Sequence, residues 1–152
     1  MTDPIAFDSI TSRFALPLLY TGQAHKEAFV NEALIRTDVL LHCAVEGERA
    51  TPPENSEDGR AWIVADSASG DWSGRDGTIA CRAAGNWIFI TPRDGMRVFD
   101  RSSGRDRLFF GSWRKASAIP EPVGGSTVDG EARAAITNLV ASLQAVGILP
   151  SA

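Results

Sequence analysis

The sequence predicts an α+β protein with an N-terminal arm and a long helix, a small antiparallel β-meander, and a C-terminal helix. Three observations predict this class. Residues 23–43 contain no glycine or proline. Between residues 62 and 115, short runs of β-branched and aromatic residues alternate with glycine-bearing turns, as in a meander. After residue 129, apolar residues recur at steps of four and three, which is the spacing of one helix face.

The first segment, residues 1–22, is expected to be an irregular arm. Its apolar residues keep neither the helix nor the strand period, and Pro4 and Pro17 interrupt it. An apolar arm without secondary structure must lie on its own domain or on a neighbouring subunit, and we expect the second. Phe14, Leu18 and Tyr20 are therefore candidates for an oligomer interface.

A helix is predicted from residue 23 to residue 43, with Thr21 as the N-cap. Val30, Leu34, Leu41 and Val45 form one apolar row, and residues 39–45 are expected to be deeply buried. His42 then becomes a core residue, whereas His25 lies on the first turns at a surface or an interface. A polar loop follows over residues 46–60.

Five strands are predicted from the periodicity: residues 62–65, 78–82, 87–90, 97–100 and 107–110, the last of which continues into residues 112–115. The short turns between them indicate antiparallel pairing and exclude a parallel sheet. Together with the helix they make one domain, residues 23–115. Two cysteines, Cys43 and Cys81, cannot form a disulfide framework or a zinc site, and we expect buried free thiols.

Residues 116–128 read as a linker that is rich in proline and glycine. A last helix is predicted over residues 129–147, with Asp129 as the N-cap and Gly147 as the C′ residue. Ile136, Leu139 and Leu143 lie on its apolar stripe. This stripe either packs on the protein's own sheet or contacts another chain, so these three residues are also interface candidates.

The sequence offers little material for catalysis. It has no phosphate-binding loop, nucleophile elbow, HExxH or CxxC motif, and only two histidines. We therefore expect no enzyme, no catalytic residue, no metal site and no cofactor. The net charge of −4 argues against nucleic acid as a partner, and no apolar run is long enough for a membrane-spanning helix.

The tripeptide Gly-x-Trp occurs three times, ending at Trp72, Trp87 and Trp113. Each tryptophan can fill the core of the small sheet. The alternative is an exposed indole that stacks on a sugar, and Trp72 with Arg75 and Asp76 is the candidate for such a glycan site, because its sequence neighbours are small or polar. Under this alternative interpretation, the protein is a carbohydrate-binding module that recognises host capsule or cell-wall glycan. A hydrolase of such glycans would need paired carboxylates that the sequence lacks.

An ordered series of blocks resembles a family of phage and prophage structural proteins of unknown function, found in tail-fibre and spike proteins. The blocks are Leu16-Pro17-Leu18-Leu19-Tyr20-Thr21-Gly22-Gln23-Ala24-His25-Lys26-Glu27, Asn31-Glu32-Ala33-Leu34, Asp38, Pro52-Pro53, Gly59, Trp62-Ile63-Val64, Gly70-Asp71-Trp72-Ser73-Gly74, Ile79-Ala80, Trp87-Ile88-Phe89, Pro92-Arg93-Asp94-Gly95 and Gly111-Ser112-Trp113. The C-terminal residues 133–149 are similar to the terminal helices of tail-fibre-associated proteins. Among short members, the resemblance is to the base of a gene transfer agent's head spike.

This resemblance implies a non-enzymatic structural protein, namely a spike or fibre base that joins a capsid or tail to a receptor-binding fibre. It implies a homo-oligomer, five-fold at a capsid vertex or three-fold in a tail fibre. The implied partners are a capsid or tail protein, a fibre protein and host polysaccharide. The implied location is the virion or phage-like particle, after assembly in the bacterial cytoplasm.

Overall fold

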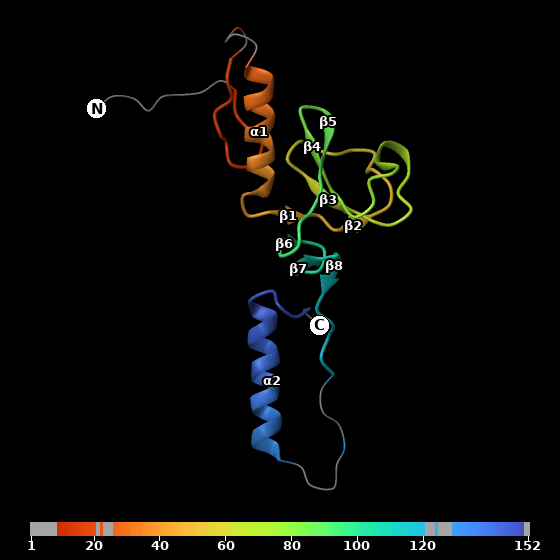
Figure 1. The fold of residues 1–152 in the computed structure, drawn as a ribbon. Helices are drawn as coiled ribbons and strands as arrows, with labels where there is room; N and C mark the ends of the chain where they lie inside the picture. The colour runs from red at the N-terminus through yellow and green to blue at the C-terminus, as the bar shows by residue number, and fades with distance from the viewer. Residues whose placement is uncertain (1–8, 21, 23–25, 121–123, 125–128, 151–152) are drawn as a thin grey trace, which may run out of the picture. The chain divides into compact units, whose positions relative to one another are not determined.

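The computed structural model describes residues 9–20, 22, 26–120, 124 and 129–150. This part of the chain contains two α-helices, one 3-10 turn and eight strands, which confirms the α+β class (Figure 1). In chain order the elements are α1 (Glu27–Leu40), β1 (Ala44–Val45), β2 (Glu48–Arg49), β3 (Ala61–Val64), η1 (Gly70–Trp72), β4 (Ile79–Ala83), β5 (Asn86–Ile90), β6 (Arg97–Asp100), β7 (Arg105–Phe110), β8 (Ser112–Lys115) and α2 (Gly130–Ala145).

The chain divides into two compact units, residues 1–92 and 93–152. The first unit holds α1 and strands β1 to β5, and the second holds β6 to β8 and α2. The division falls inside the segment 23–115, which the sequence interpretation treated as one domain. Each unit is described by itself.

The sheet of the first unit has the strand order β2-β3-β4-β5. Strands β3, β4 and β5 pair antiparallel, as the turn pattern predicts. The β4–β5 hairpin turns over Ala84 and Gly85, whose φ angles of 48° and 74° are both positive. Two consecutive positive φ angles characterise the type I′ turn that suits a two-residue hairpin.

Strand β2 corrects the prediction in two ways. The segment 46–60 was expected to be a polar loop, but Glu48 and Arg49 form a short strand within it. This strand pairs with β3 in parallel, with Glu48 opposite Ile63, so the sheet is mixed and not purely antiparallel. Residues 50–60 supply the crossover that a parallel pair needs. Both β2 residues are exposed, which is typical of an edge strand and explains why no apolar alternation marks it.

One face of this sheet carries small and aliphatic residues. The register places Ile63 opposite Ile79, and Ala61 opposite Cys81, and all four are buried. Cys43 and Cys81 are buried free thiols, as expected. Burial raises the pKa of Cys43, and it raises the pKa of Cys81 to about 12. Both thiols therefore stay protonated and unreactive at neutral pH.

The opposite face of the sheet carries the aromatic core. Trp72 is fully buried and packs with Val64 and Ala80, and its ring lies 6.3 Å from that of Trp62 and 5.0 Å from that of Trp87. Phe89 also packs against this cluster. The interpretation of Trp72 as a core residue fits this burial.

Helix α1 is shorter than predicted, ending at Leu40 instead of residue 43. The predicted apolar row does not match the buried face, because Asp38 and Val39 are buried while Val30 and Leu41 are 40% and 41% exposed. His42 is exposed with a φ of 46°, so its assignment to the core was wrong. The chain turns there instead of continuing the helix. The predicted N-cap Thr21 and the side chain of His25 lie outside the described residues.

The arm corrects another prediction, because residues 9–20 fold back on their own unit. The Asp38 carboxylate accepts hydrogen bonds from the backbone N–H groups of Arg13 and Phe14, at 3.0 and 2.8 Å. Asn31 makes two bonds to the backbone of Leu19, at 2.8 and 3.1 Å. The arm therefore needs no second subunit to satisfy these backbone groups.

Gly59 lets the arm approach the sheet. Its φ is +87°, and a Cβ atom there would lie 3.1 Å from Cβ of Ser12 and 3.2 Å from Cγ of Arg13. The guanidinium of Arg13 donates a hydrogen bond to the carbonyl oxygen of Val39 at 2.7 Å, within the last turn of α1. Asn31, Asp38 and Gly59, which all belong to the resemblance pattern, thus have a common role in seating the arm.

In the second unit, β6, β7 and β8 form an antiparallel meander. The strand predicted to continue from residue 107 to residue 115 is two strands, because the chain turns at Gly111, whose φ is +69°. Helix α2 begins at the predicted N-cap, where the Asp129 side chain accepts from the Ala132 N–H at 3.0 Å. The helix ends at Ala145, and the predicted C′ residue Gly147 follows with a φ of +73°. The carbonyl oxygen of Gly147 accepts from the Asp106 N–H at 2.7 Å. Leu149 is buried, so the end of α2 is anchored.

Candidate assembly surfaces and a candidate binding groove

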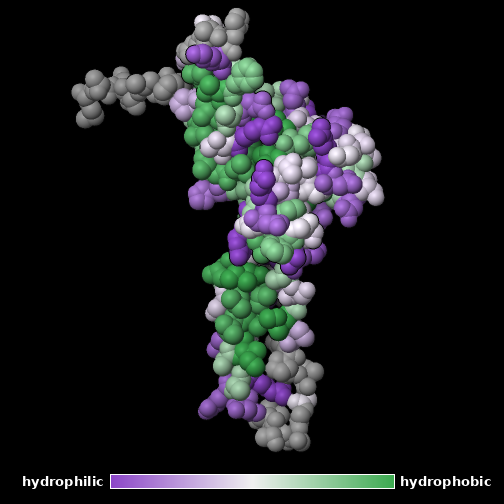
Figure 2. All heavy atoms as spheres, in the orientation of Figure 1, coloured by the Kyte–Doolittle hydropathy of each residue, from purple (hydrophilic) through white to green (hydrophobic). Residues whose placement is uncertain are grey.

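Helix α2 presents an apolar stripe made of Ile136, Leu139, Leu143 and Val146, here called the α2 stripe. Ile136, Leu139 and Val146 are 43%, 60% and 67% exposed, and none of the residues of α2 is buried. Figure 2 shows hydrophobic residues gathered along this helix. The described structure therefore does not place the stripe against the protein's own sheet. An exposed apolar stripe of this kind marks an interaction surface.

Helix α1 has a second such surface, on the side that faces away from Asp38 and Val39. Phe29, Val30, Ala33 and Leu40 form this surface, here called the outer α1 face, and all four are exposed. Phe29 is 80% exposed, which is unusual for so large an apolar side chain. A helix that is apolar on both sides is typical of one packed between two partners. The sequence interpretation missed this face because it assigned all the apolar residues of the helix to one core.

The interface candidates of the arm lie on the surface to different degrees. Phe14 and Tyr20 are 44% and 48% exposed. Leu18 is half-buried and lines a cavity of about 250 Å³ together with Ile35, Val39 and Cys81. The two aromatic side chains therefore keep part of their surface exposed, whereas Leu18 contributes mainly to the contact between the arm and its own unit.

The burial of Trp72 argues against the alternative interpretation, a glycan site at Trp72, Arg75 and Asp76. With 0% of its surface exposed, the indole of Trp72 has no face on which a sugar could stack. Arg75 lies over the ring of Phe89 at 5.0 Å, and the Asp76 carboxylate accepts from the Ala68 N–H at 3.0 Å. Both residues thus support the loop that carries Trp72. Polar sequence neighbours did not indicate exposure, because the short turn η1 directs this side chain onto the sheet.

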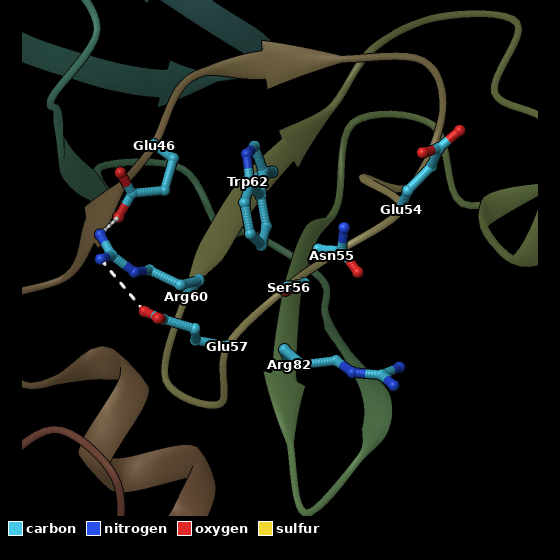
Figure 3. A pocket seen from close by; sticks show the side chains of 8 residues that line it. All are labelled: Glu46, Glu54, Asn55, Ser56, Glu57, Arg60, Trp62 and Arg82. Carbon is cyan, nitrogen blue, oxygen red and sulfur yellow. Dashed lines mark hydrogen bonds and ion pairs between the residues drawn. The ribbon is translucent and has the colours of Figure 1, made fainter.

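A groove of about 730 Å³ lies instead beside Trp62. Figure 3 shows the indole of Trp62 standing between the Arg60 ion pairs and the loop that carries Asn55. Its lining residues are Glu46, Glu54, Asn55, Ser56, Glu57, Arg60, Trp62 and Arg82. Trp62 is half-buried, so part of its ring remains accessible there. Sequence reasoning missed this groove because its walls come from three separate segments.

Arg60 is held in the groove by two carboxylates. Its guanidinium lies 2.8 Å from Glu46 and 3.4 Å from Glu57. The hydrogen bond with Glu46 is the main reason that the pKa of Arg60 lies above its usual value. On the neighbouring strand, the guanidinium of Arg82 lies over the ring of Trp87 at 5.2 Å. The groove therefore combines an aromatic surface with fixed charged groups.

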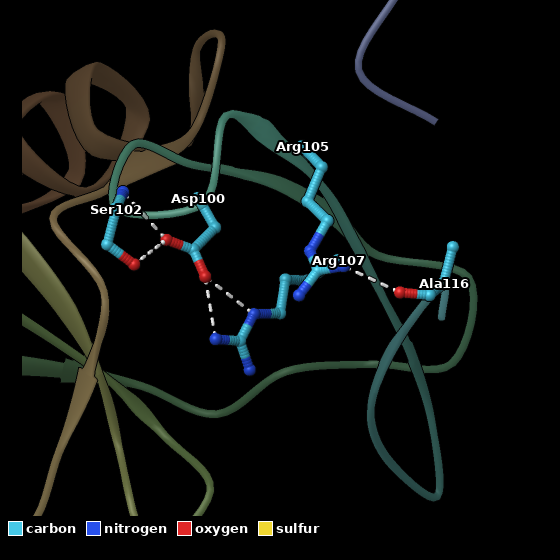
Figure 4. Close-up of polar contacts among 5 residues, drawn as sticks. All are labelled: Asp100, Ser102, Arg105, Arg107 and Ala116. Carbon is cyan, nitrogen blue, oxygen red and sulfur yellow. Dashed lines mark hydrogen bonds and ion pairs between the residues drawn. The ribbon is translucent and has the colours of Figure 1, made fainter. Parts of the chain in front are cut away.

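The second unit contains a buried ion pair. Arg107 donates from Nε to the Asp100 carboxylate at 2.8 Å, and Ser102 donates from its hydroxyl to the same carboxylate at 2.6 Å (Figure 4). Burial by itself raises the pKa of Asp100, but the hydrogen bonds from Ser102 and Arg107 outweigh it and leave the pKa below its usual value. Because both charges are paired and buried, this pair holds β6 to β7 and does not form a reactive site.

The described residues contain no group of three or more metal-ligating side chains that could hold an ion. Nor does any helix within them have the length and hydropathy to cross a bilayer. The candidate surfaces that the described residues form are the two apolar helix faces and the groove beside Trp62.

Comparison with protein families gives one finding. A family model described as protein of unknown function (DUF2793) matches residues 30–114. The match covers more than half of the chain and runs from α1 to β8. No curated protein matches the sequence.

Proposed function

We propose a function for this chain from the premise that it belongs to the DUF2793 family, whose own function is unknown. We infer that it is a non-enzymatic structural component of a phage-like particle. In this role it is a spike or fibre base that joins the capsid or tail to a receptor-binding fibre. The resemblance of its sequence blocks to phage tail-fibre and spike proteins, and to the base of a gene transfer agent's head spike, motivates this proposal.

The observation that carries the proposal is the pair of exposed apolar helix faces, one in each unit. Leu139 on α2 is 60% exposed and Phe29 on α1 is 80% exposed, although burying such side chains is favourable. An adaptor must bind different neighbours through different surfaces, and each unit supplies one. In this proposal the α2 stripe joins copies of the chain, and the outer α1 face contacts the capsid or tail protein.

The roles of the pattern residues also favour a structural function. Asn31 and Asp38 bind backbone groups of the arm, and Gly59 permits its close approach. These residues position a segment of chain and present no reactive group to solvent. A protein whose distinctive residues fix its own architecture fits a scaffold better than an enzyme.

The test is to locate the chain in particles released by the bacterium that encodes it. We expect the protein to co-sediment with purified particles and to be present in copy numbers that are multiples of three or five. Immunogold electron microscopy then distinguishes a head position from a tail position. Finding the protein only in the soluble fraction, while particles assemble normally without it, would disprove the structural role.

A further inference from the structure

The groove beside Trp62 has the composition of a ligand site. We propose that it binds a neutral saccharide of one to a few hexose units, with Trp62 as the stacking surface and Glu54, Asn55 and Arg82 as hydrogen-bonding groups. This inference goes beyond the assembly role and does not depend on it. The volume of about 730 Å³ lies within the range of roughly 300–1,000 Å³ that is typical of small-molecule sites.

The register of the sheet places the aromatic and cationic walls of the groove on one face. Trp62 on β3 lies opposite Ala80 on β4, and Arg82 is two residues after Ala80 on β4. Because side chains alternate along a strand, Trp62 and Arg82 project from the same face of the sheet. Residues 54–57 of the crossover loop form the facing wall. In Figure 3 the side chains of Glu54, Asn55 and Arg82 lie on the same side of the Trp62 ring.

The indole of Trp62 is held in position before any ligand arrives. Its ring contacts that of Trp87 edge to face at 5.8 Å and that of Trp72 at 6.3 Å. Trp72 is itself fully buried, so the support beneath Trp62 is rigid. A surface that is already ordered costs little conformational entropy on binding. The part of the ring that remains exposed offers a flat apolar area, which suits the C–H face of a pyranose.

The charge of the groove selects against ionic ligands. Three carboxylates and two guanidinium groups line it, and this slight acidic excess disfavours phosphates and other polyanions. A cation would compete with Arg60 for Glu46 and Glu57, which already bind it at 2.8 and 3.4 Å. The remaining pair, Glu54 and Arg82, has opposite charges. A neutral ligand with many hydrogen-bonding groups fits this balance.

The polar groups that remain match the chemistry of hydroxyls. Each sugar hydroxyl both donates and accepts; Glu54 accepts, Arg82 donates, and Asn55 does both. Ser56 also lines the groove, and its Oγ is buried without a hydrogen-bond partner among the described residues. Buried polar atoms are nearly always satisfied, so a ligand hydroxyl within reach of this oxygen would be stabilised.

The experiment is an NMR titration of the whole chain that follows the tryptophan indole N–H signals, with the Trp62 signal assigned from Trp62→Phe. The probes are maltose, cellobiose and N,N′-diacetylchitobiose, and then dextran. We expect a saturable shift of the Trp62 signal with a dissociation constant of roughly 1 mM for at least one disaccharide. The double variant Glu54→Ala/Asn55→Ala, on exposed loop positions, should bind about tenfold more weakly.

The matched control is Arg49→Gln, which removes an exposed guanidinium on strand β2 of the same sheet but outside the groove. Its affinity should equal that of the wild type. Tighter binding of dextran than of maltose would indicate a polysaccharide ligand. Equal affinities for the two would indicate that a terminal sugar is bound, and either result supports the proposal. It is overturned if no probe shifts Trp62, if the double variant binds as well as wild type, or if only a trilysine peptide gives a saturable shift.

Discussion

Asp38 shows how one buried carboxylate can fix a whole segment. It is 3% exposed, and its two oxygens accept from consecutive backbone N–H groups at Arg13 and Phe14. The Arg13 side chain returns to the same helix and donates to Val39. The arm and α1 therefore stabilise each other, since the helix carbonyl and the arm amides would otherwise lack partners inside the protein.

We predict that Asp38→Ala releases the arm while the sheet stays folded. The free energy of unfolding should fall by about 1–3 kcal/mol, because two backbone N–H groups lose a charged acceptor. Limited trypsin digestion should then cut after Arg13 much faster than in the wild type. Asp38→Asn is the control, because its amide oxygen keeps one acceptor, and it should show an intermediate rate. An unchanged rate in Asp38→Ala would contradict this account.

Asp100 predicts an acid-sensitive contribution to the stability of the second unit. Its pKa is lowered in the folded protein, so its contribution is complete above the unfolded-state pKa of about 3.9 and is lost as the pH falls through the lower folded value. Asp100→Asn should destabilise this unit by about 3–5 kcal/mol at pH 7, because Arg107 is left buried without its counter-charge.

Hydrogen exchange of the β6 and β7 amides measures this effect. The difference between wild type and Asp100→Asn should shrink as the pH is lowered below about 4, since the carboxylate of the unfolded chain takes up a proton there before that of the folded chain. The amides of β3 and β4, in the first unit, serve as an internal control and should not change. A difference that stays constant down to pH 2 would show that the charge of Asp100 is irrelevant.

At the scale of elements, the apolar stripe of α2 has two explanations: it contacts another chain, or it packs on the protein's own sheet. We predict that replacing Ile136, Leu139 and Leu143 with glutamine dissociates the oligomer and leaves the monomer nearly as stable as before. The first two side chains are already 43% and 60% exposed in the single chain, and exposed substitutions usually change stability by about 0.5 kcal/mol or less. Analytical ultracentrifugation and thermal unfolding measure the two quantities.

The control for this helix is a triple variant on its opposite face, Ala134→Gln, Thr137→Gln and Ala141→Gln. All three positions are exposed and lie about half a turn away from the stripe. The control should keep the oligomeric state of the wild type. If the stripe variant instead loses about 2–5 kcal/mol per residue with its mass unchanged, the stripe packs on the protein's own sheet.

At the scale of the whole molecule, we predict that substitutions in the outer α1 face prevent incorporation into particles without changing the stability of the chain. The double variant Phe29→Gln/Leu40→Gln should fold and melt like the wild type, because these side chains are 80% and 41% exposed. It should be absent from particles purified by density gradient. Glu32→Gln, on another side of the same helix, is the control and should be incorporated. Normal incorporation of the double variant would exclude this face as the particle contact.

The local parts of this fold were predictable from the sequence. Strands β3 to β7 follow glycine-bearing turns, and Asp129 and Gly147 mark the ends of α2 because capping is a local matter. The parts that depend on distant contacts were not. β2 is two exposed residues with no pattern, and the seating of the arm depends on Asp38, which lies 25 residues from Arg13.

The candidate sites also depend on contacts between residues that are distant in the sequence, so they were not predictable from it. Trp72 is surrounded in sequence by small and polar residues, yet η1 directs it into the core, while Trp62, from a strand of apolar residues, borders the groove. The stripe on α2 was visible as a periodicity, but its exposure was not, because periodicity does not distinguish a core from an interface. Only the three-dimensional positions of Glu54, Arg82 and Trp62 bring the groove together.

The distribution of the four tryptophans gives the two units separate optical signals. Three indoles of the first unit lie within 5.0 to 6.3 Å of one another, close enough for coupled electronic transitions and a dichroism couplet in the far-ultraviolet indole band. Trp113, in the second unit, lies with its ring 5.2 Å from that of Phe109. The couplet therefore follows the melting of residues 1–92 alone. In Trp113→Phe the emission reports the same unit, and the difference from wild-type emission reports the other.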